Sequence, residues 1–113
     1  DGKVKDEFLR KRDALHSVLW KNGYKTPKAF FSNTEYDKEF DLYLLQNVGY
    51  DKLQNYAAGI FLTTYAPTSL REYFATGFTE FFLNPDGHNY MKKVSPQLYK
   101  KLFELYSEEG LDV

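Results

Sequence analysis

Residues 65–85, YAPTSLREYFATGFTEFFLNP, carry the clearest helical pattern in the chain. Ser69 is a suitable N-cap, and the run Asn84-Pro85-Asp86-Gly87 is typical of a turn. Between them, apolar residues recur at the i, i+3, i+4, i+7 spacing that places them on one face of a helix, namely Leu70, Tyr73, Phe74, Gly77, Phe78, Phe81 and Phe82. The sequence therefore predicts a helix over 69–83.

A single acidic residue, Glu72, lies in the first turn of this predicted helix. At 100° per residue it falls roughly opposite the apolar face, near Thr76, Thr79 and Glu80. Ser69-x-x-Glu72 matches a capping box, in which the acid bonds back to the start of its own helix. Alternatively, the carboxylate is directed at a group outside the helix. These two interpretations imply different chemistry for the protein.

The rest of the chain predicts further helices. Val4, Phe8, Leu15, Val18 and Leu19 recur at helical spacing, and Asn22-Gly23 supplies a stop. The predicted helices outside 69–83 cover 3–21, 35–48 after an N-cap at Thr34, about 51–58 after an Asp51-x-x-Gln54 capping box, and 96–106 after Ser95-Pro96. Residues 59–67 fit a buried loop or a brief extended segment. We predict a mainly α protein of about five helices. Residues 1–113 form a single domain or the C-terminal portion of a larger one.

Composition narrows the class of protein. The chain has 113 residues, of which 42% are hydrophobic, with ten Tyr and ten Phe, so it can bury a core. Its 15 basic and 16 acidic residues are interspersed, and the formal charge of −1 gives no net field for nucleic acid. No apolar run approaches the roughly 18–20 residues that span a bilayer. The absence of Cys excludes disulfides and thiolate metal sites but does not fix the compartment.

Local motifs do not complete an active site. The two histidines are His16, expected to be exposed or half-packed in mid-helix, and His88, expected to be solvated after the turn. Neither has a second His four residues away, so no helical two-His metal pair is present. Asp37, Glu39 and Asp41 are expected to form a solvated face.

Residues 65–85 also carry a family resemblance. The run YAPTSLREYFA at 65–75, continued by Gly77-Phe78 and by FFLNP at 81–85, resembles the C-terminal part of the catalytic domain of anthrax lethal factor-like zinc metallopeptidases. The Pro-Pro endopeptidases belong to the same group. The run SPQLY at 95–99 looks like that family's closing segment. The resemblance covers roughly 65–105; residues 35–64 are compatible through helix content only, and residues 1–34 show no matching motif.

The resemblance implies a zincin-like helical C-terminal subdomain and a divided metal site. Glu72 matches the third protein ligand to zinc, which follows two His on an upstream H-E-x-x-H helix. Tyr65, seven residues earlier, matches the tyrosine whose hydroxyl points at the scissile carbonyl. A carboxylate is a good zinc ligand, and a phenol with a pKa near 10 can donate to a developing oxyanion. The implied partners are a peptide or protein substrate and the upstream part of the same protein. The toxin-containing family favours a secreted or extracellular location.

Two departures from the family pattern leave two hypotheses. H-E-x-x-H does not occur in these 113 residues, and Thr76 stands where family members usually carry a second acid. Either the motif lies upstream of Asp1, as the non-Met start favours, or the chain is an inactive relative that serves as a helical interaction or structural module. Under the first hypothesis the chain contributes Glu72 and Tyr65 to a zinc metalloendopeptidase and is inactive alone.

Overall fold

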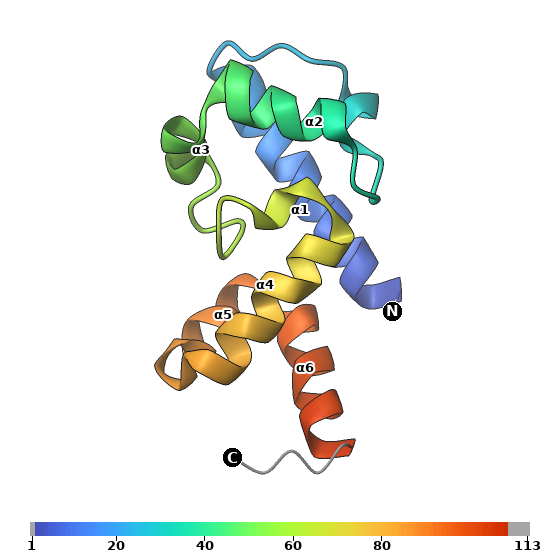
Figure 1. The fold of residues 1–113 in the computed structure, drawn as a ribbon, viewed down its shortest axis with the longest axis vertical. Helices are drawn as coiled ribbons and strands as arrows, with labels where there is room; N and C mark the ends of the chain where they lie inside the picture. Colours follow the sequence, from blue (N-terminus) through green and yellow to red (C-terminus); the bar gives the residue numbers. More distant parts are fainter. Residues whose placement is uncertain (1, 109–113) are drawn as a thin grey trace.

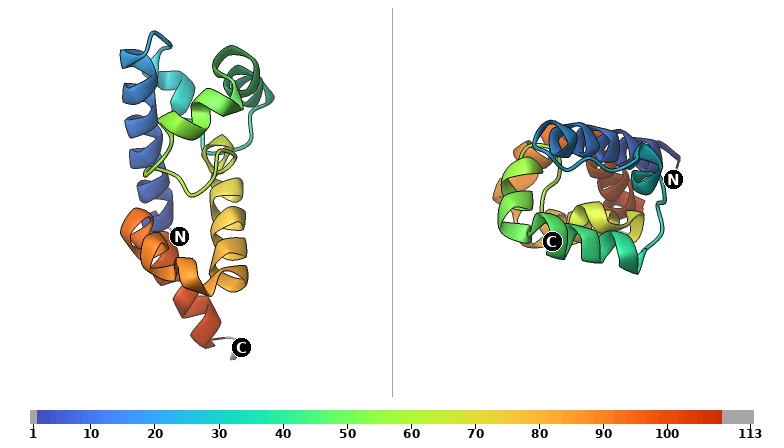
Figure 2. Two further views of the ribbon diagram at one scale, coloured as in Figure 1. Left: turned by 90° about the vertical axis from the view of Figure 1, so that its left-hand side faces the viewer. Right: turned by 90° about the horizontal axis from the view of Figure 1, so that it is seen from above.

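The longest helix, α1 (Gly2–Lys21), extends along much of a molecule that measures 46 × 25 × 21 Å (Figures 1 and 2). The computed structural model describes residues 2–108. Helix α1 contacts α3, α4 and α6 and the 3-10 turn at Lys28–Phe31. Val4, Phe8, Leu15 and Leu19 form its buried apolar face, so the helix predicted over 3–21 is confirmed. It stops at the predicted place, where Gly23 has a φ of +95°.

The second predicted helix begins later than expected. Helix α2 covers Lys38–Leu42 and continues as a π-helical segment over Tyr43–Val48. Its N-cap is Asp37, whose Oδ1 accepts from the Glu39 amide at 3.0 Å. The expected cap at Thr34 is wrong because the Thr34 carbonyl accepts from the Leu70 amide at 2.8 Å and so joins this segment to the start of α4.

The third helix is also shorter than predicted. Helix α3 covers Tyr50–Tyr56 and begins directly after Gly49, whose carbonyl accepts from the Leu53 amide at 2.9 Å. Asp51 lies inside its first turn and makes no capping bond, so the predicted capping box is wrong. Residues 57–65 then form turns and bends, followed by a 3-10 turn at Ala66–Thr68. The loop interpretation of 59–67 is therefore the correct one.

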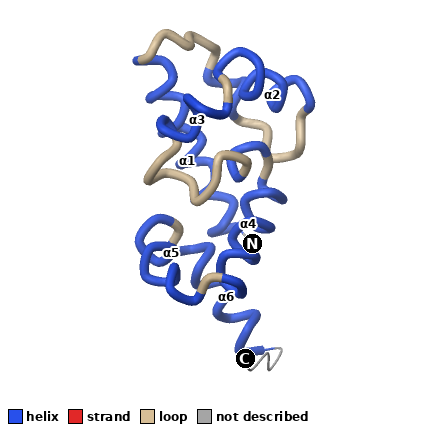
Figure 3. Tube along the Cα trace, turned by 60° about the vertical axis from the view of Figure 1, so that its left-hand side comes forward, coloured by secondary structure: helices blue, strands red, loops and turns tan. Residues whose placement is uncertain are grey.

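The second half of the chain contains three α-helices that follow one another through short connections. Helix α4 covers Leu70–Leu83 with Ser69 as its N-cap, as predicted. After a 3-10 turn at Pro85–Gly87 come α5 (His88–Val94), which was not predicted, and α6 (Pro96–Glu108). Residues 2–108 thus hold six α-helices and no strand, which confirms the mainly α class (Figure 3). Within the same residues, no helix has the length and apolar character to cross a membrane.

Close packing joins α4 to α6. Gly77 faces Leu98, and a Cβ at residue 77 would lie 2.4 Å from the Leu98 Cδ2 atom. Leu98 is fully buried and has little room to move aside. The absence of a side chain at Gly77 is what lets the two helices approach this closely.

A buried carboxylate on α1 caps α6. Glu7 accepts from the amides of Gln97 at 2.7 Å and Leu98 at 3.2 Å, which are first-turn amides of α6 without a partner inside the helix. The Tyr73 hydroxyl donates to the same carboxylate at 2.5 Å. One acidic side chain therefore ties together α1, α4 and α6.

Arg12 joins the turns and loops by hydrogen bonds, as Glu7 joins the helices. Its guanidinium is almost fully buried and lies over the rings of Phe8 and Phe40. It donates to four backbone carbonyls, those of Phe31 at 2.8 Å, Asn33 at 3.1 Å, Pro67 at 2.6 Å and Thr68 at 3.2 Å. Because these carbonyls lie outside helical hydrogen-bond ladders, Arg12 supplies donors that the backbone does not.

Replacing Arg12 should therefore cost far more stability than replacing its exposed neighbour. We expect Arg12→Met to lower the free energy of unfolding by about 3–5 kcal/mol, because four carbonyls lose their donor. Arg10→Met, on the exposed side of α1, is the matched control and should change little. Urea denaturation of both variants measures the difference. Equal costs would contradict the assigned role of Arg12.

The capping role of Glu7 gives a second expectation. Glu7→Gln should lower the free energy of unfolding by about 1–3 kcal/mol, since the amide side chain loses the charge that accepts three hydrogen bonds. Asp6→Asn, which removes the same charge from an exposed neighbouring position, is the control. Thermal and urea unfolding compare the two. Amide hydrogen exchange locates the effect. Faster exchange confined to Gln97 and Leu98 at the start of α6 would identify the lost cap as the cause.

Candidate functional site

The capping motif at the start of α4 is only half formed. The Ser69 hydroxyl oxygen accepts from the Glu72 amide at 3.0 Å, as a capping box requires. The Glu72 carboxylate does not return the bond. Within residues 2–108 it makes no hydrogen bond and no ion pair. Ser69 therefore caps the helix, and the half-buried Glu72 side chain remains uncommitted.

The backbone at Tyr65 is fixed by a short turn. The Tyr65 carbonyl accepts from both the amide and the hydroxyl of Thr68, at 3.1 and 2.8 Å. Thr68 is fully buried, and its own carbonyl accepts from Arg12. The Tyr65 side chain leaves this anchored turn and is 38% exposed. In the described part of the chain its hydroxyl has no hydrogen-bond partner.

The charge of Glu72 acts on the Tyr65 hydroxyl in the folded chain. The pKa of Tyr65 is raised by the negative charge of Asp41, by partial desolvation and by the charge of Glu72, in that order. Each carboxylate disfavours the phenolate, because a second negative charge nearby costs electrostatic energy. Tyr65 and Glu72 therefore lie within electrostatic range of each other, at the junction of the 66–68 turn and α4.

Asp41 is the site residue that the sequence did not reveal. It was expected on a solvated face, but it is half-buried, and it accepts from the hydroxyls of Tyr36 at 2.9 Å and Tyr50 at 3.1 Å. The Tyr50 ring in turn packs edge-on against the Tyr65 ring, with centroids 6.4 Å apart. We refer to Tyr36, Asp41, Tyr50, Tyr65 and Glu72 as the tyrosine–carboxylate cluster. Its members come from five segments, and no linear motif joins Tyr36, Asp41 and Tyr50 to the pair Tyr65 and Glu72.

The cluster keeps its phenols protonated. The hydrogen bond to Asp41 is the main cause of the raised pKa of Tyr36, whereas burial is the main cause for Tyr50, followed by the same carboxylate. Asp41 thus holds two phenols directly and acts on the third, Tyr65, through space. Tyr65 is the phenol of the cluster whose donor is not used within residues 2–108, and its raised pKa keeps it protonated at neutral pH.

The two histidines have local partners. His16 is half-buried, as expected, with its Nε2 atom 2.7 Å from the Thr26 carbonyl. His88 is not a solvated turn residue: it begins α5, stacks on the Phe81 ring at 4.5 Å and places Nε2 2.6 Å from the Phe81 carbonyl. The described residues contain no group of three or more His, Cys, Asp or Glu side chains that could hold a metal ion.

Comparison of the chain with protein-family models, with curated proteins and with solved structures finds no match. A carboxylate without a protein partner suits a shared metal ion, to which it would contribute one ligand. The remaining ligands of such an ion would have to come from outside residues 2–108.

The electrostatic arrangement of the cluster can be tested by titration. Asp41→Asn should lower the pKa of Tyr65 towards the ordinary value near 10, because the largest cause of its elevation is removed. The pKa of Tyr36 should fall as well. Carbon-13 NMR of the tyrosine ring carbons follows each phenol separately. Glu39→Gln, an exposed charge on the same helix, should leave both pKa values unchanged. An unaltered Tyr65 titration in Asp41→Asn would contradict the arrangement.

Proposed function

We propose that this chain is the C-terminal part of a zinc-dependent metalloendopeptidase of the lethal factor-like type. In this proposal Glu72 is the third protein ligand to zinc, and Tyr65 is the hydrogen-bond donor to the oxyanion. The observation that carries the proposal is the pairing of two uncommitted groups. The charge of Glu72 raises the pKa of Tyr65, and within residues 2–108 neither the Glu72 carboxylate nor the Tyr65 hydroxyl makes a hydrogen bond.

Each residue of the cluster has a defined task in this proposal. Bound zinc supplies Lewis-acid activation for peptide hydrolysis. The Tyr65 hydroxyl donates a hydrogen bond to the oxygen of the scissile carbonyl as negative charge develops there. Asp41, which is not a ligand in this proposal, is the largest cause of the raised pKa of Tyr65 and helps the phenol to keep its proton. Tyr50 supports the Tyr65 ring by edge-on packing.

Ser69 caps α4 without help from the Glu72 side chain. Because its hydroxyl oxygen satisfies the Glu72 amide, the Glu72 side chain is not required for helix initiation and is available as a ligand. The two histidine ligands and the glutamate base of an H-E-x-x-H segment would lie outside this chain. The 113-residue polypeptide alone is accordingly expected to bind zinc weakly and to cleave nothing.

A second candidate function is a catalytically inactive helical module that serves interaction or structure. The position of Thr76 favours it. The Thr76 hydroxyl, one turn after Glu72, donates to the Tyr73 carbonyl at 3.1 Å. It therefore gives the Glu72 carboxylate none of the support that a second acid would give a metal ligand. Under this interpretation the cluster is a surface feature and Glu72 has no metal to bind.

Zinc binding by the full-length protein separates the two candidates. Glu72→Gln should abolish stoichiometric zinc, measured by metal analysis after dialysis, because an amide is a poor replacement for a carboxylate ligand. Glu80→Gln on the same helix is the control and should keep its zinc. Tyr65→Phe should keep zinc but lose about 10²–10³-fold in kcat on a peptide substrate, as loss of an oxyanion donor does.

The inactive-module alternative predicts a different pattern. Neither the parent protein nor its variants would then hold zinc. Glu72→Gln would change only stability, by the about 0.3–1 kcal/mol that a carboxylate gains near a helix N-terminus. Full zinc content in Glu72→Gln would also exclude Glu72 as a ligand.

A further inference from the structure

An aromatic pocket lies among α4, α5 and α6, which contact one another. Its volume is about 370 Å³, and its walls come from these three helices and from the turn after α4. The lining residues are Phe81, Phe82, Pro85, His88, Phe103 and Tyr106. Phe81 follows Glu72 by nine residues, which at 1.5 Å per residue is about 14 Å along the helix axis. The pocket is therefore separate from the tyrosine–carboxylate cluster.

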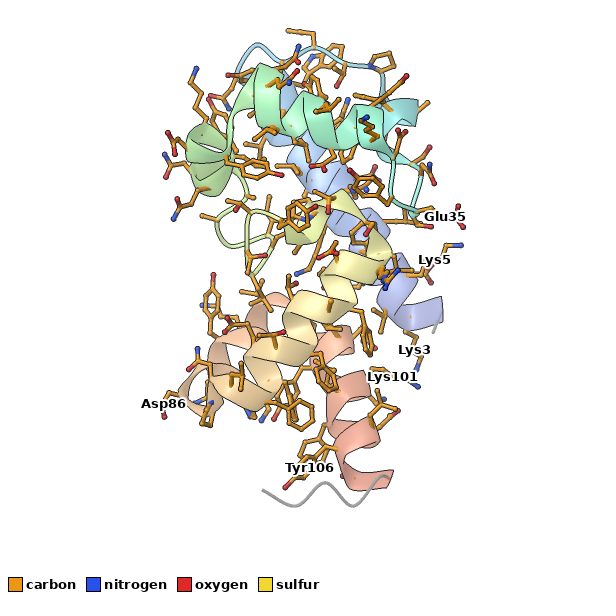
Figure 4. The ribbon with its side chains drawn as sticks, viewed as in Figure 1. Lys3, Lys5, Glu35, Asp86, Lys101 and Tyr106 are labelled. Atoms are coloured by element: carbon orange, nitrogen blue, oxygen red, sulfur yellow. The ribbon has the colours of Figure 1, made fainter. Side chains whose placement is uncertain are left out.

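The walls of the pocket are aromatic rings that pack against one another. The centroid of the Phe81 ring lies 5.1 Å from that of Phe82 and 4.5 Å from that of His88. Tyr106 extends from α6 toward α4 (Figure 4), and its ring centroid lies 6.2 Å from that of Phe82 and 6.3 Å from that of Phe103. These separations are typical of favourable aromatic pairs. A flat aromatic ligand would make contacts of the same kind with the walls.

His88 brings a hydrogen-bond acceptor to the pocket. Its Nε2 atom lies 2.6 Å from the Phe81 carbonyl oxygen, which can only accept, so Nε2 carries the proton. In the neutral imidazole Nδ1 then keeps its lone pair, and within residues 2–108 no donor bonds to it. Nδ1 is therefore the atom of His88 that can accept a hydrogen bond from a ligand.

The lining favours a neutral ligand. None of the six described residues that line the pocket is Asp, Glu, Lys or Arg. Asp86 of the neighbouring turn lies at the edge of the molecule (Figure 4) and is not a lining residue. Lys92 lies 5.4 Å from the centroid of the Tyr99 ring, which itself packs against His88. A cationic ligand would thus find no counter-charge in the lining and a like charge beside it.

We propose that this pocket binds a small neutral aromatic molecule that carries an N–H or O–H donor, as indoles and phenols do. The rings of Phe82, Phe103 and Tyr106 enclose the ligand, and its donor bonds to Nδ1 of His88. An apolar cavity of about 150 Å³ is enough to hold benzene, so a volume of about 370 Å³ has room for one or two rings. The proposal goes beyond the proteolytic function and does not depend on zinc.

The test titrates indole into the nitrogen-15-labelled protein and compares it with benzofuran, a bicycle of the same shape in which oxygen replaces the N–H. Saturable amide shifts are expected at Phe82, His88 and Phe103. Benzofuran should bind about three- to tenfold more weakly, because one hydrogen bond is lost. Equal affinity of the two compounds would overturn the proposal, as would shifts confined to another part of the molecule.

Two ring truncations separate the pocket from exposed aromatic surface in general. Phe103 is 50% exposed and lines the pocket, whereas Tyr90 on α5 is 52% exposed and does not line it. Phe103→Ala should weaken indole about three- to tenfold, as loss of an aromatic contact does, and Tyr90→Ala should leave the affinity unchanged. Both variants should retain the wild-type circular dichroism spectrum, because both side chains are half exposed. Equal loss of affinity in the two variants would overturn the proposal.

A substitution at His88 tests the donor contact directly. His88→Phe keeps a ring beside Phe81 and removes Nδ1. Indole and benzofuran should therefore bind this variant equally. A wild-type preference for indole in His88→Phe would overturn the proposed hydrogen bond.

Two other occupants are distinguished in the same experiment. Tighter binding of phenyltrimethylammonium than of indole would show a cation site and overturn the proposal. Concentration-dependent shifts of the pocket amides without any ligand would show that a second copy of the chain covers the pocket, and would overturn it as well. Zinc content plays no part in these readouts, so failure here leaves the proposed protease function untouched.

Discussion

The fold depends on three buried charged side chains of α1, which need polar partners from other segments of the chain. Glu7, Lys11 and Arg12 are almost fully buried, and a buried charge is tolerated only when it is bonded to polar groups. Lys11 donates to the Ile60 carbonyl and the Ser95 hydroxyl, both at 2.6 Å, yet burial still lowers its pKa to about 8 despite the nearby charge of Glu7. The partners of these three side chains belong to segments far along the chain, so α1 can be buried only when those segments are in place.

This constraint also positions the candidate site. Arg12 holds the carbonyls of Pro67 and Thr68, and Thr68 in turn holds the carbonyl of Tyr65. One residue later, Ser69 caps α4 and fixes the first turn that carries Glu72. The separation of Tyr65 and Glu72 thus depends on a cation that lies behind them in the core. The same buried cation therefore holds the backbone from which both site residues extend.

Sequence patterns predicted the elements that bury long apolar stripes and missed those that do not. The helices over 3–21, 69–83 and 96–106 follow from spacing. Helix α5 has Met91 as its only buried residue and offers no comparable stripe. Thr34 failed as a cap because its carbonyl is used by Leu70, a tertiary contact that no local pattern contains. The pair Tyr65 and Glu72 is visible at a spacing of seven residues, whereas Asp41 reaches the site only through folding. The Asp41 carboxylate accepts hydrogen bonds from Tyr36 and Tyr50, which are five and nine residues away and lie in other segments.

Some groups of the tyrosine–carboxylate cluster make hydrogen bonds within the described part of the fold, and others do not. Asp41, Tyr36 and Tyr50 satisfy one another, so their presence is explained by structure alone. An acid in the first turn of α4 gains about 0.3–1 kcal/mol from the helix dipole, which explains a carboxylate at Glu72 but not the exposed phenol beside it. The Tyr65 hydroxyl finds no partner in the described part of the chain, and its neighbouring carboxylates make its proton harder to lose. A donor held protonated beside an uncommitted acceptor contributes little to stability. The proposed function gives these two groups a task, because in it they act on a molecule outside the fold.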